Sequence, residues 1–381
     1  MKMPRSIPIN RPIIGEEEVS AVIQVLRSGI LTNPTPQGGE KVREFEKQLA
    51  SYLGVKEVIA VNSGTSALLA SYLTLNVKRS SEVLMPSLTF VATANAALLA
   101  GLRPVFVDVN LEDYTLDIND LEKKVTRNTV AIVPVHLYGF PADMDEVLKI
   151  AENNSLKVIE DAAQALGSSY RGFKVGTLGD VGCFSFYPGK IITTGEGGAI
   201  ATNNLELAEQ LKSVRTHGQV KGYDYERLGS NLRMPELEAA IGLVQLKKLN
   251  DFLSIRRRNA EYLLRRLEEE KLGDQLILPQ LKPHKQPNWY LLTVRVEKGQ
   301  TLRDKVVSYL NSRGIAATIY YPTPLHKTPL YAKLGYGELK LPKTEAVAST
   351  VFSLPTHPSL TLEDIEHIVS ALKEAFKHFA N

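Results

Sequence analysis

The chain has 381 residues and a formal net charge of +3, from 45 lysines and arginines against 42 aspartates and glutamates. Hydrophobic residues make up 44% and charged residues 23%, a composition typical of folded globular proteins, which excludes a mainly disordered or fibrous chain. The charge is too balanced to predict binding to nucleic acid or to an anionic membrane, and the single cysteine, Cys183, excludes an intrachain disulfide.

The N-terminal segment lacks the short apolar run and the small-residue cleavage site of a signal peptide, and no stretch is long and apolar enough to predict a membrane-spanning helix. We therefore expect a cytoplasmic protein. None of the seven histidines forms an HExxH pair, which leaves a metal site without support. At about 150 residues per domain, the length predicts two to three domains.

The first two predicted elements are helices. Apolar residues recur at helical spacing over 15–28 and over 40–53. The segment between them, LTNPTPQGG (31–39), contains two prolines and two glycines and therefore predicts a loop.

Short apolar runs alternate with helical patterns from residue 57 onwards. The helical patterns include 65–75, 90–101 and 143–153. Because the apolar runs contain no regular polar positions, they are typical of strands buried on both faces, as in a mostly parallel sheet covered by helices. The sequence therefore predicts an α/β fold, with strands at 57–61, 82–86, 104–109, 130–135, 157–161 and 182–186.

A long helical pattern over 234–270 leads the chain out of this first unit. Beyond it, the apolar runs at 289–296 and 315–321 and the helical patterns at 301–312 and 361–379 predict a smaller α+β domain. We place the boundary near residue 250. This gives a large domain over 1–250, which includes the N-terminal helices, and a small C-terminal domain over 251–381.

The candidate site lies where strands end, because open parallel sheets bind ligands beyond the carboxyl ends of their strands. Gly64, Thr65 and Ser66 follow the first strand and begin the next helix. The free N–H groups and positive dipole end of such a helix favour a phosphate, although an ordinary helix cap uses the same residue types. Asp161 ends the strand 157–161 and is a candidate metal ligand, base or partner of a protonated ring nitrogen, or a simple capping residue.

GCFSFYPGKIITTGEGGAI (182–200) is the most informative stretch. A Pro-Gly turn after the strand presents Lys190 between two apolar runs. A lysine held there can have a lowered pKa and act as a Schiff-base nucleophile, whereas most lysines are solvated surface charges. The stretch is not a Walker A loop, because Ile191 replaces the required Ser or Thr, and Ile200 stands where a GxGxxG loop has its last glycine.

These pieces match the needs of pyridoxal phosphate (PLP), which requires an amine for its aldehyde, an acid for its ring nitrogen, donors for its phosphate and a surface for its ring. Lys190 and Asp161 supply the amine and the acid. The helix start at 64–66 and Ser185 supply the phosphate donors, and Phe90 supplies the stacking surface. On periodicity alone, Phe90 is nearly as consistent with a core aromatic.

With these motifs in order, the sequence resembles the DegT/DnrJ/StrS-type sugar-nucleotide aminotransferases, a PLP-dependent family with the type I aminotransferase fold. The resemblance implies a mostly parallel large domain, a smaller C-terminal α+β domain and a homodimer with shared active sites. It covers almost the whole chain and is carried by VNSGTSALL (61–69), MPSLTFVATANA (85–96), PVFVDV (104–109), VPVHLYG (133–139), IEDAAQALGSSYRG (159–172), GDVGCFSFYPGKIITTGEGGAI (179–200), GSNLRMPELEAAIGLVQL (229–246) and YYPTPLHKTPLY (320–331).

The resemblance also implies a role for each motif residue. Lys190 matches the lysine that binds the cofactor covalently, Asp161 the partner of its ring nitrogen, and Gln164 the residue beside its ring and hydroxyl. The other implied cofactor contacts are Gly64, Thr65, Ser66 and Ser185 at the phosphate, Phe90 on the ring, and Asn231 at the phosphate of the neighbouring subunit's cofactor. The residues placed on the substrate side are Arg233, Tyr321 and His326.

The implied reaction transfers an amino group, with glutamate as the expected donor, to a keto sugar carried on a nucleoside diphosphate. The stretch 320–326 favours a 3-keto substrate by resemblance. Two features depart from the family pattern: Gly189 precedes the lysine where many members have Thr or Ser, and the loop 31–39 is longer than usual. Two alternatives are a PLP-dependent sugar dehydratase, in which a histidine replaces the lysine, and a non-catalytic regulator on the same scaffold.

Three further features receive structural interpretations. His136 follows a strand with a buried pattern, so it fits a place behind the site as well as a substrate contact. The arginine run 256–258 is typical of a solvated helix face rather than of a nucleic-acid patch. Cys183 is typical of a small buried hydrophobic residue.

Overall fold

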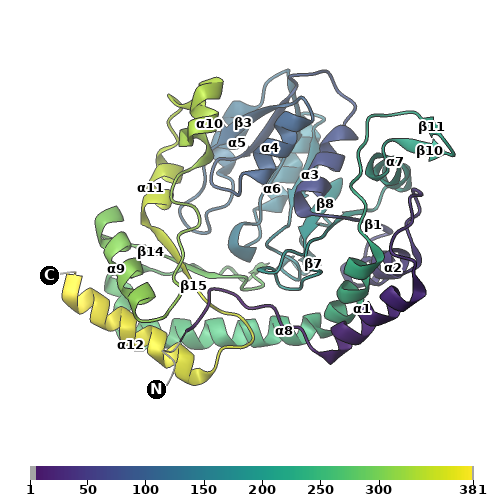
Figure 1. The fold of residues 1–381 in the computed structure, drawn as a ribbon. Coiled ribbons are helices and arrows are strands. Elements are labelled where there is room, and N and C mark those ends of the chain that lie inside the picture. The colour runs from purple at the N-terminus through teal and green to yellow at the C-terminus, as the bar shows by residue number, and fades with distance from the viewer. Residues whose placement is uncertain (1–5, 380–381) are drawn as a thin grey trace.

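The computed structural model describes residues 6–379, and Figure 1 shows their arrangement. A seven-stranded sheet lies at its centre, with all neighbours parallel except one strand, β9 (Gly198–Thr202), which is antiparallel to both its neighbours. The mostly parallel sheet predicted from the sequence is therefore confirmed. The strand order is β1 (Glu57–Val61), β9, β8 (Val181–Ser185), β5 (Lys157–Asp161), β4 (Thr129–Ile132), β2 (Glu82–Pro86) and β3 (Arg103–Val107).

Successive residues of a strand enter two different cores, one on each face of the sheet. In β1, Val58 and Ala60 belong to the first core, and Ile59 and Val61 belong to the second. This explains why the strands read as unbroken apolar runs. The helices of the first face include α2 (Glu40–Leu53), α5 (Ile118–Lys124) and α6 (Met144–Asn153), and those of the second include α3 (Gly64–Leu73), α4 (Ala92–Leu99) and α7 (Leu205–Arg215).

A single 34-residue helix, α8 (Glu236–Glu269), runs along the base of the molecule in Figure 1 and connects two regions. As far as Phe252, its buried apolar residues join the first core of the sheet, and α1 (Glu16–Ser28) packs beside it. From Ala260 onwards they join a third core near the C-terminus. This third core also contains α9 (Gln300–Ser312), α12 (Leu362–Phe379) and a three-stranded sheet of β12 (Leu276–Ile277), β14 (Leu292–Val296) and β15 (Val351–Leu354).

The predicted boundary at residue 250 therefore falls inside α8. Packing contacts cross the division between 1–250 and 251–381 in both directions. Ile7 packs into the third core and pairs with Ile315, whereas Leu325, Tyr331 and Leu341 pack into the second core of the sheet. The two domain ranges stay a prediction, and their outermost residues, 1–5 and 380–381, lie outside the described part; residues 1–5 also begin the segment tested for a signal peptide.

The remaining elements are short. The run 315–321 joins no sheet and makes only isolated bridges, such as that of Thr318 with Ser353. Within residues 6–379, none of the helices is long and apolar enough to cross a membrane. The short elements include α10 (Pro329–Tyr331), α11 (Pro342–Thr350), β6 (Ser169–Tyr170), β7 (Phe173–Lys174), β10 (Gln219–Lys221), β11 (Asp224–Tyr225) and β13 (Lys285–Gln286).

Candidate active site

Three segments meet at the carboxyl edge of the sheet, where β1 and β8 end and β9 begins. Gly64, at the start of α3, lies directly against Ser185, the last residue of β8. A Cβ atom added at Gly64 would lie 2.8 Å from the Cβ of Ser185, and one added at Gly198 would lie 2.7 Å from the backbone nitrogen of Gly64. Glycine is needed at both positions to let the α3 start approach the strand ends.

The start of α3 is arranged as a typical capped helix end. The Ser63 hydroxyl accepts a hydrogen bond from the Ser66 backbone N–H at 3.0 Å, and the Ser66 hydroxyl donates to the Asn62 side chain at 2.6 Å. The Thr65 side chain is exposed. The first N–H groups of a helix have no partner inside the helix, so this end, with the nearby Ser185 hydroxyl, offers the donor set that a phosphate needs.

Asp161 lies at the end of β5 and is 6% exposed. Its carboxylate accepts hydrogen bonds from the Thr93 hydroxyl at 2.8 Å and from the Ala163 backbone at 3.2 Å. Burial raises the pKa of Asp161, while these two hydrogen bonds and the nearby Lys190 oppose the rise. A buried carboxylate of this kind gains from a cationic partner, and a protonated pyridine nitrogen is such a partner.

Lys190 follows β8 in a tight turn, in which its backbone N–H donates to the Tyr187 carbonyl at 2.8 Å. Its ammonium nitrogen lies 5.0 Å from the centroid of the Tyr290 ring. Burial lowers the pKa of Lys190 to about 8, against the pull of Asp161. About one-tenth of the side chains are then uncharged and nucleophilic at pH 7, a far larger share than for a solvated lysine.

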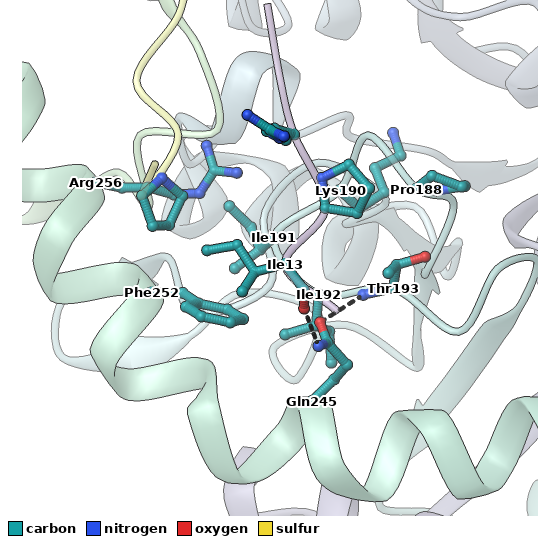
Figure 2. Close-up of a pocket in the computed structure, with 12 residues that line it drawn as sticks. Ile13, Pro188, Lys190, Ile191, Ile192, Thr193, Gln245, Phe252 and Arg256 are labelled. Carbon is teal, nitrogen blue, oxygen red and sulfur yellow. Dashed lines mark hydrogen bonds between the residues drawn. The ribbon is translucent and has the colours of Figure 1, made fainter. Parts of the chain in front are cut away.

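A small cavity lies beneath the Lys190 turn, and Figure 2 shows it lined by Ile191 and Ile192 of the loop and by Gln245 and Phe252 of α8. Its volume of ≈ 10 Å³ admits no more than about one water molecule. This cavity is therefore too small to hold a cofactor.

Gln164, Tyr321 and Phe90 form one further group. The Gln164 side chain accepts from the Tyr138 backbone N–H at 2.6 Å and donates to the Tyr321 hydroxyl at 3.3 Å. The Phe90 ring is 55% exposed, and its centroid lies 6.2 Å from that of Tyr321. Phe90 is therefore not a core aromatic, and its exposure suits a stacking role. Thr93, which the sequence interpretation overlooked, joins this group to Asp161, because its backbone N–H donates to the Phe90 carbonyl.

Asn231 and Arg233 lie in the segment that enters α8. The backbone of Arg233 pairs with Val61 at the end of β1, whereas Asn231 pairs with Thr216 and its side chain is exposed. Within residues 6–379, no hydrogen bond or ion pair joins either side chain to Lys190 or Asp161. An exposed Asn231 is available to a second subunit.

His326 lies elsewhere than the sequence suggested. The ring is fully buried, with Nδ1 2.7 Å from the Ser87 hydroxyl and Nε2 3.1 Å from a carboxylate oxygen of Glu345. This buried position does not agree with the expected substrate contact, because both ring nitrogens are engaged within the chain and the ring ties residues 324–328 to the end of β2. Burial also lowers the pKa of His326, which favours the neutral ring.

His136 occupies a place behind the site. It is fully buried, lies 2.9 Å from Glu160 and accepts a hydrogen bond from the Ala142 backbone at 3.0 Å, so it supports β5 rather than contacting substrate. Cys183 is buried, as expected. Among the described residues, no group of three or more His, Cys, Asp or Glu side chains could hold a metal ion.

Comparison with known proteins identifies the family. The model of the DegT/DnrJ/EryC1/StrS aminotransferase family matches residues 12–373. The chain is 40% identical to the GDP-perosamine synthase of Caulobacter vibrioides, over 88% of this chain and 90% of that protein. It is 38% identical to a dTDP-3-amino-3,4,6-trideoxy-alpha-D-glucose transaminase of Streptomyces venezuelae, over 94% and 92%. Helicobacter pylori PseC, an aminotransferase involved in the biosynthesis of pseudoaminic acid, superposes with a TM-score of 0.91 at 32% identity, over 98% of this chain and 100% of PseC. The chain belongs to the DegT/DnrJ/EryC1/StrS aminotransferase family.

Proposed function

We propose that this protein is a PLP-dependent aminotransferase that converts a nucleotide-linked keto sugar to an amino sugar, with glutamate as the amino donor. The observation that carries the proposal is the pairing of a lysine of lowered pKa, Lys190, with a buried carboxylate, Asp161, at the carboxyl edge of the sheet. The family membership and the names of the relatives support the same reaction.

The residues present fit the cofactor. When bound, PLP supplies an electron sink for the donor's α-carbon. Asp161 would hold the ring nitrogen in its protonated form, and the start of α3 with Ser185 would bind the phosphate. Phe90 would cover one face of the ring, with Gln164 beside it. Once released from the cofactor, the Lys190 amine is the group that accepts and returns the substrate proton, and a pKa of about 8 suits both directions near neutral pH.

The two alternatives lack this support. In the related dehydratases a histidine takes the place of the lysine, so Lys190 disfavours that reaction. A non-catalytic regulator needs no lysine of lowered pKa beside a buried carboxylate, yet the chain retains both.

The proposal includes a homodimer with shared active sites. On α1 the structure buries only Glu18 and Val25, while Val19, Ile23 and Leu26 are 42%, 40% and 54% exposed. Such an apolar stripe on a helix surface is typical of an interface. Together with the exposed Asn231, it supports a second copy of the chain as the partner.

The 3-keto position of the sugar is also a proposal. The 3-amino sugar in the name of the Streptomyces relative agrees with the preference for a 3-keto substrate suggested by residues 320–326. The cytoplasmic location expected from the sequence stays a prediction.

The test is a panel of 3-keto and 4-keto sugar nucleotides with glutamate or glutamine as donor, combined with borohydride trapping. We expect one sugar nucleotide to be aminated and the reduced cofactor label to map to the Lys190 peptide. A label on another lysine, or no amination across the panel by PLP-saturated protein, would contradict the proposal.

A further inference from the structure

Arg256 is a buried charge that the proposed chemistry does not use. The sequence predicted a solvated face for 256–258, and Arg257 and Arg258 are exposed, but Arg256 is only 1% exposed. Burial lowers its pKa to about 10, so it stays charged at neutral pH. Its hydrogen bonds within the described residues go to neutral groups, and its Nε atom has no partner there. Burying a guanidinium without a carboxylate costs stability, which indicates a role for the charge.

One arm of the Arg256 guanidinium leads to the peptide before Lys190. Its Nη2 atom donates to the Asn10 side-chain oxygen at 2.9 Å. The side-chain nitrogen of Asn10 donates in turn to the Gly189 carbonyl. Asn10 therefore bridges α8 and the Lys190 turn, and both ends of the bridge line the small cavity of Figure 2 through Arg256 and Lys190.

The other arm leads to the ring beneath the Lys190 ammonium. Its Nη1 atom donates to the Tyr290 carbonyl at 3.2 Å, and the Tyr290 N–H donates to the Asn288 side chain at 2.9 Å. The backbone of Tyr290 is therefore held on both sides, and its ring faces Lys190 at 5.0 Å. An ammonium held over an aromatic face keeps part of its charge stabilisation while losing water.

Because Gly189 has no side chain, the position of Lys190 depends more on two other contacts: that of Asn10 with the Gly189 carbonyl and that of the Tyr290 ring with the Lys190 ammonium. Gly189 cannot anchor the turn itself. A Cβ atom at this position would meet the Tyr187 ring at 3.6 Å and the Tyr290 hydroxyl at 3.9 Å, so the Tyr290 hydroxyl lies close to the space that a side chain of residue 189 would enter. The turn is held by its carbonyl, through Asn10, and Lys190 is held by the ring of Tyr290.

We propose that Arg256 is a positioning residue for Lys190, which fixes the lysine from both sides through Asn10 and through Tyr290. The proposal rests on the role of Lys190 as the cofactor-binding lysine. Reactive groups need to be held within about 0.5 Å of their productive position, and Arg256 joins the N-terminal segment, α8 and the Tyr290 strand entry to that task. When the contacts through Asn10 and Tyr290 are lost, the Lys190 side chain moves away from the Tyr290 ring and becomes solvated.

Two variants test the proposal. Arg256→Met keeps the length of the side chain and removes every donor. Asn10→Leu is neutral and close in size, and it removes both the acceptor for Arg256 and the donor to the Gly189 carbonyl without adding a charge; it carries the test alone if Arg256→Met does not fold. Arg257→Met is the matched control, because it removes an exposed arginine from the next position of the same helix.

The readouts need neither sugar nucleotide nor amino donor. The first is the pH dependence of trace acetylation of Lys190 in full-length, cofactor-free protein, measured by peptide mass spectrometry. The second is the rate at which PLP attaches covalently, followed by absorbance. Asp161, the charged group that acts on the Lys190 ammonium, is unchanged in all variants. Failure of the wild-type protein to aminate any sugar would count against the proposed function without affecting either measurement.

We expect Arg256→Met and Asn10→Leu to raise the pKa of Lys190 by about one unit towards that of a solvated lysine, which slows labelling and PLP attachment at pH 7 by about tenfold. Arg257→Met should match the wild type. The proposal is overturned if a folded variant labels and binds PLP within twofold of the wild type, even when its melting temperature falls, because that result describes a purely structural residue.

Discussion

Asp161 shows how burial prepares a single residue for a partner that carries a positive charge. Its carboxylate is buried, accepts hydrogen bonds from Thr93 and Ala163, and has a raised pKa. In Asp161→Asn, the neutral amide cannot keep a ring nitrogen protonated. We expect the fold and the bound cofactor to persist while kcat falls by roughly 10²–10³, the size typical of losing one such electrostatic contact.

The measurement for Asp161→Asn is turnover of the best sugar nucleotide, with absorbance of bound PLP and a thermal melt as controls. Turnover close to that of the wild type would refute the assignment.

The lowered pKa of Lys190 predicts how its reaction with PLP depends on pH. Only the uncharged amine attacks an aldehyde, and burial lowers the pKa of Lys190 from 10.5 to about 8. The rate of covalent PLP attachment to cofactor-free protein should therefore rise as the pH increases through 8 and level off above about 9, because the ammonium form dominates only below the pKa. Stopped-flow absorbance between pH 6 and pH 10 measures this midpoint; a midpoint near 10.5 would show that Lys190 behaves as a solvated lysine.

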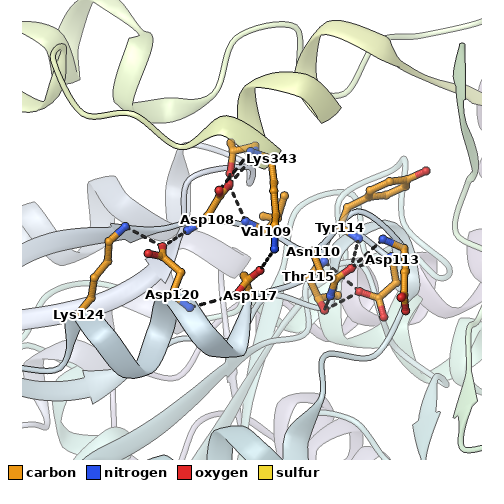
Figure 3. A network of polar contacts seen from close by, with 12 residues as sticks. Asp108, Val109, Asn110, Asp113, Tyr114, Thr115, Asp117, Asp120, Lys124 and Lys343 are labelled. Carbon is orange, nitrogen blue, oxygen red and sulfur yellow. Dashed lines mark hydrogen bonds and ion pairs between the residues drawn. The ribbon is translucent and has the colours of Figure 1, made fainter. Parts of the chain in front are cut away.

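Single elements of the fold depend on contacts from distant parts of the chain, as α11 illustrates. Its N-terminal residue has no capping side chain of its own. Asp108, just after β3, accepts from the Thr344 N–H and hydroxyl at 2.6 Å each and from the Lys343 N–H at 3.1 Å (Figure 3). A residue directly after a strand of the sheet thus caps a helix that lies more than 230 positions later in the sequence.

Asp108→Ala should therefore destabilise the protein by about 1–3 kcal/mol, because it removes a helix cap and leaves the buried Thr344 hydroxyl without its partner. Denaturant or thermal unfolding measures the loss. The control is Asp145→Ala, which removes a half-exposed ion pair with Arg171 and should cost less than about 1 kcal/mol. Equal losses in the two variants would contradict the capping role.

Strands and site residues differ in how far they could be predicted from the sequence. Six of the seven strands of the sheet were predictable because each is a short apolar run buried on both faces. Lys190 and Asp161 were chosen as candidates because Asp161 ends one such run and Lys190 follows another after a short turn. β9 was not among the predicted strands, and its antiparallel direction depends on the path of the connecting loop. His326 and Arg256 were assigned to the wrong surroundings, because their partners, Ser87 and Asn10, lie 239 and 246 positions away.

At the scale of the whole molecule, the site within one chain lacks a group that the family resemblance assigns to it. Within residues 6–379, the Asn231 side chain is exposed and forms no hydrogen bond or ion pair with Lys190 or Asp161. The apolar stripe of α1, formed by Val19, Ile23 and Leu26, is also exposed. Both observations agree with a dimer in which Asn231 of one subunit reaches the cofactor phosphate of the other. A hydrogen bond to a charged group contributes about 1.5–3 kcal/mol, so Asn231→Ala should weaken cofactor retention without unfolding the chain.

The sharper test of the shared site mixes two inactive variants, Lys190→Ala and Asn231→Asp, after dissociation and reassociation. If the sites are shared, each mixed dimer has one site that carries both changes and one that carries neither. Part of the activity should therefore return, up to about half of that of a wild-type dimer for each mixed dimer, because one site in two is intact. Native mass spectrometry confirms that mixed dimers have formed. If mixed dimers are present and inactive, each chain builds its own site, and a monomer at working concentrations would lead to the same conclusion.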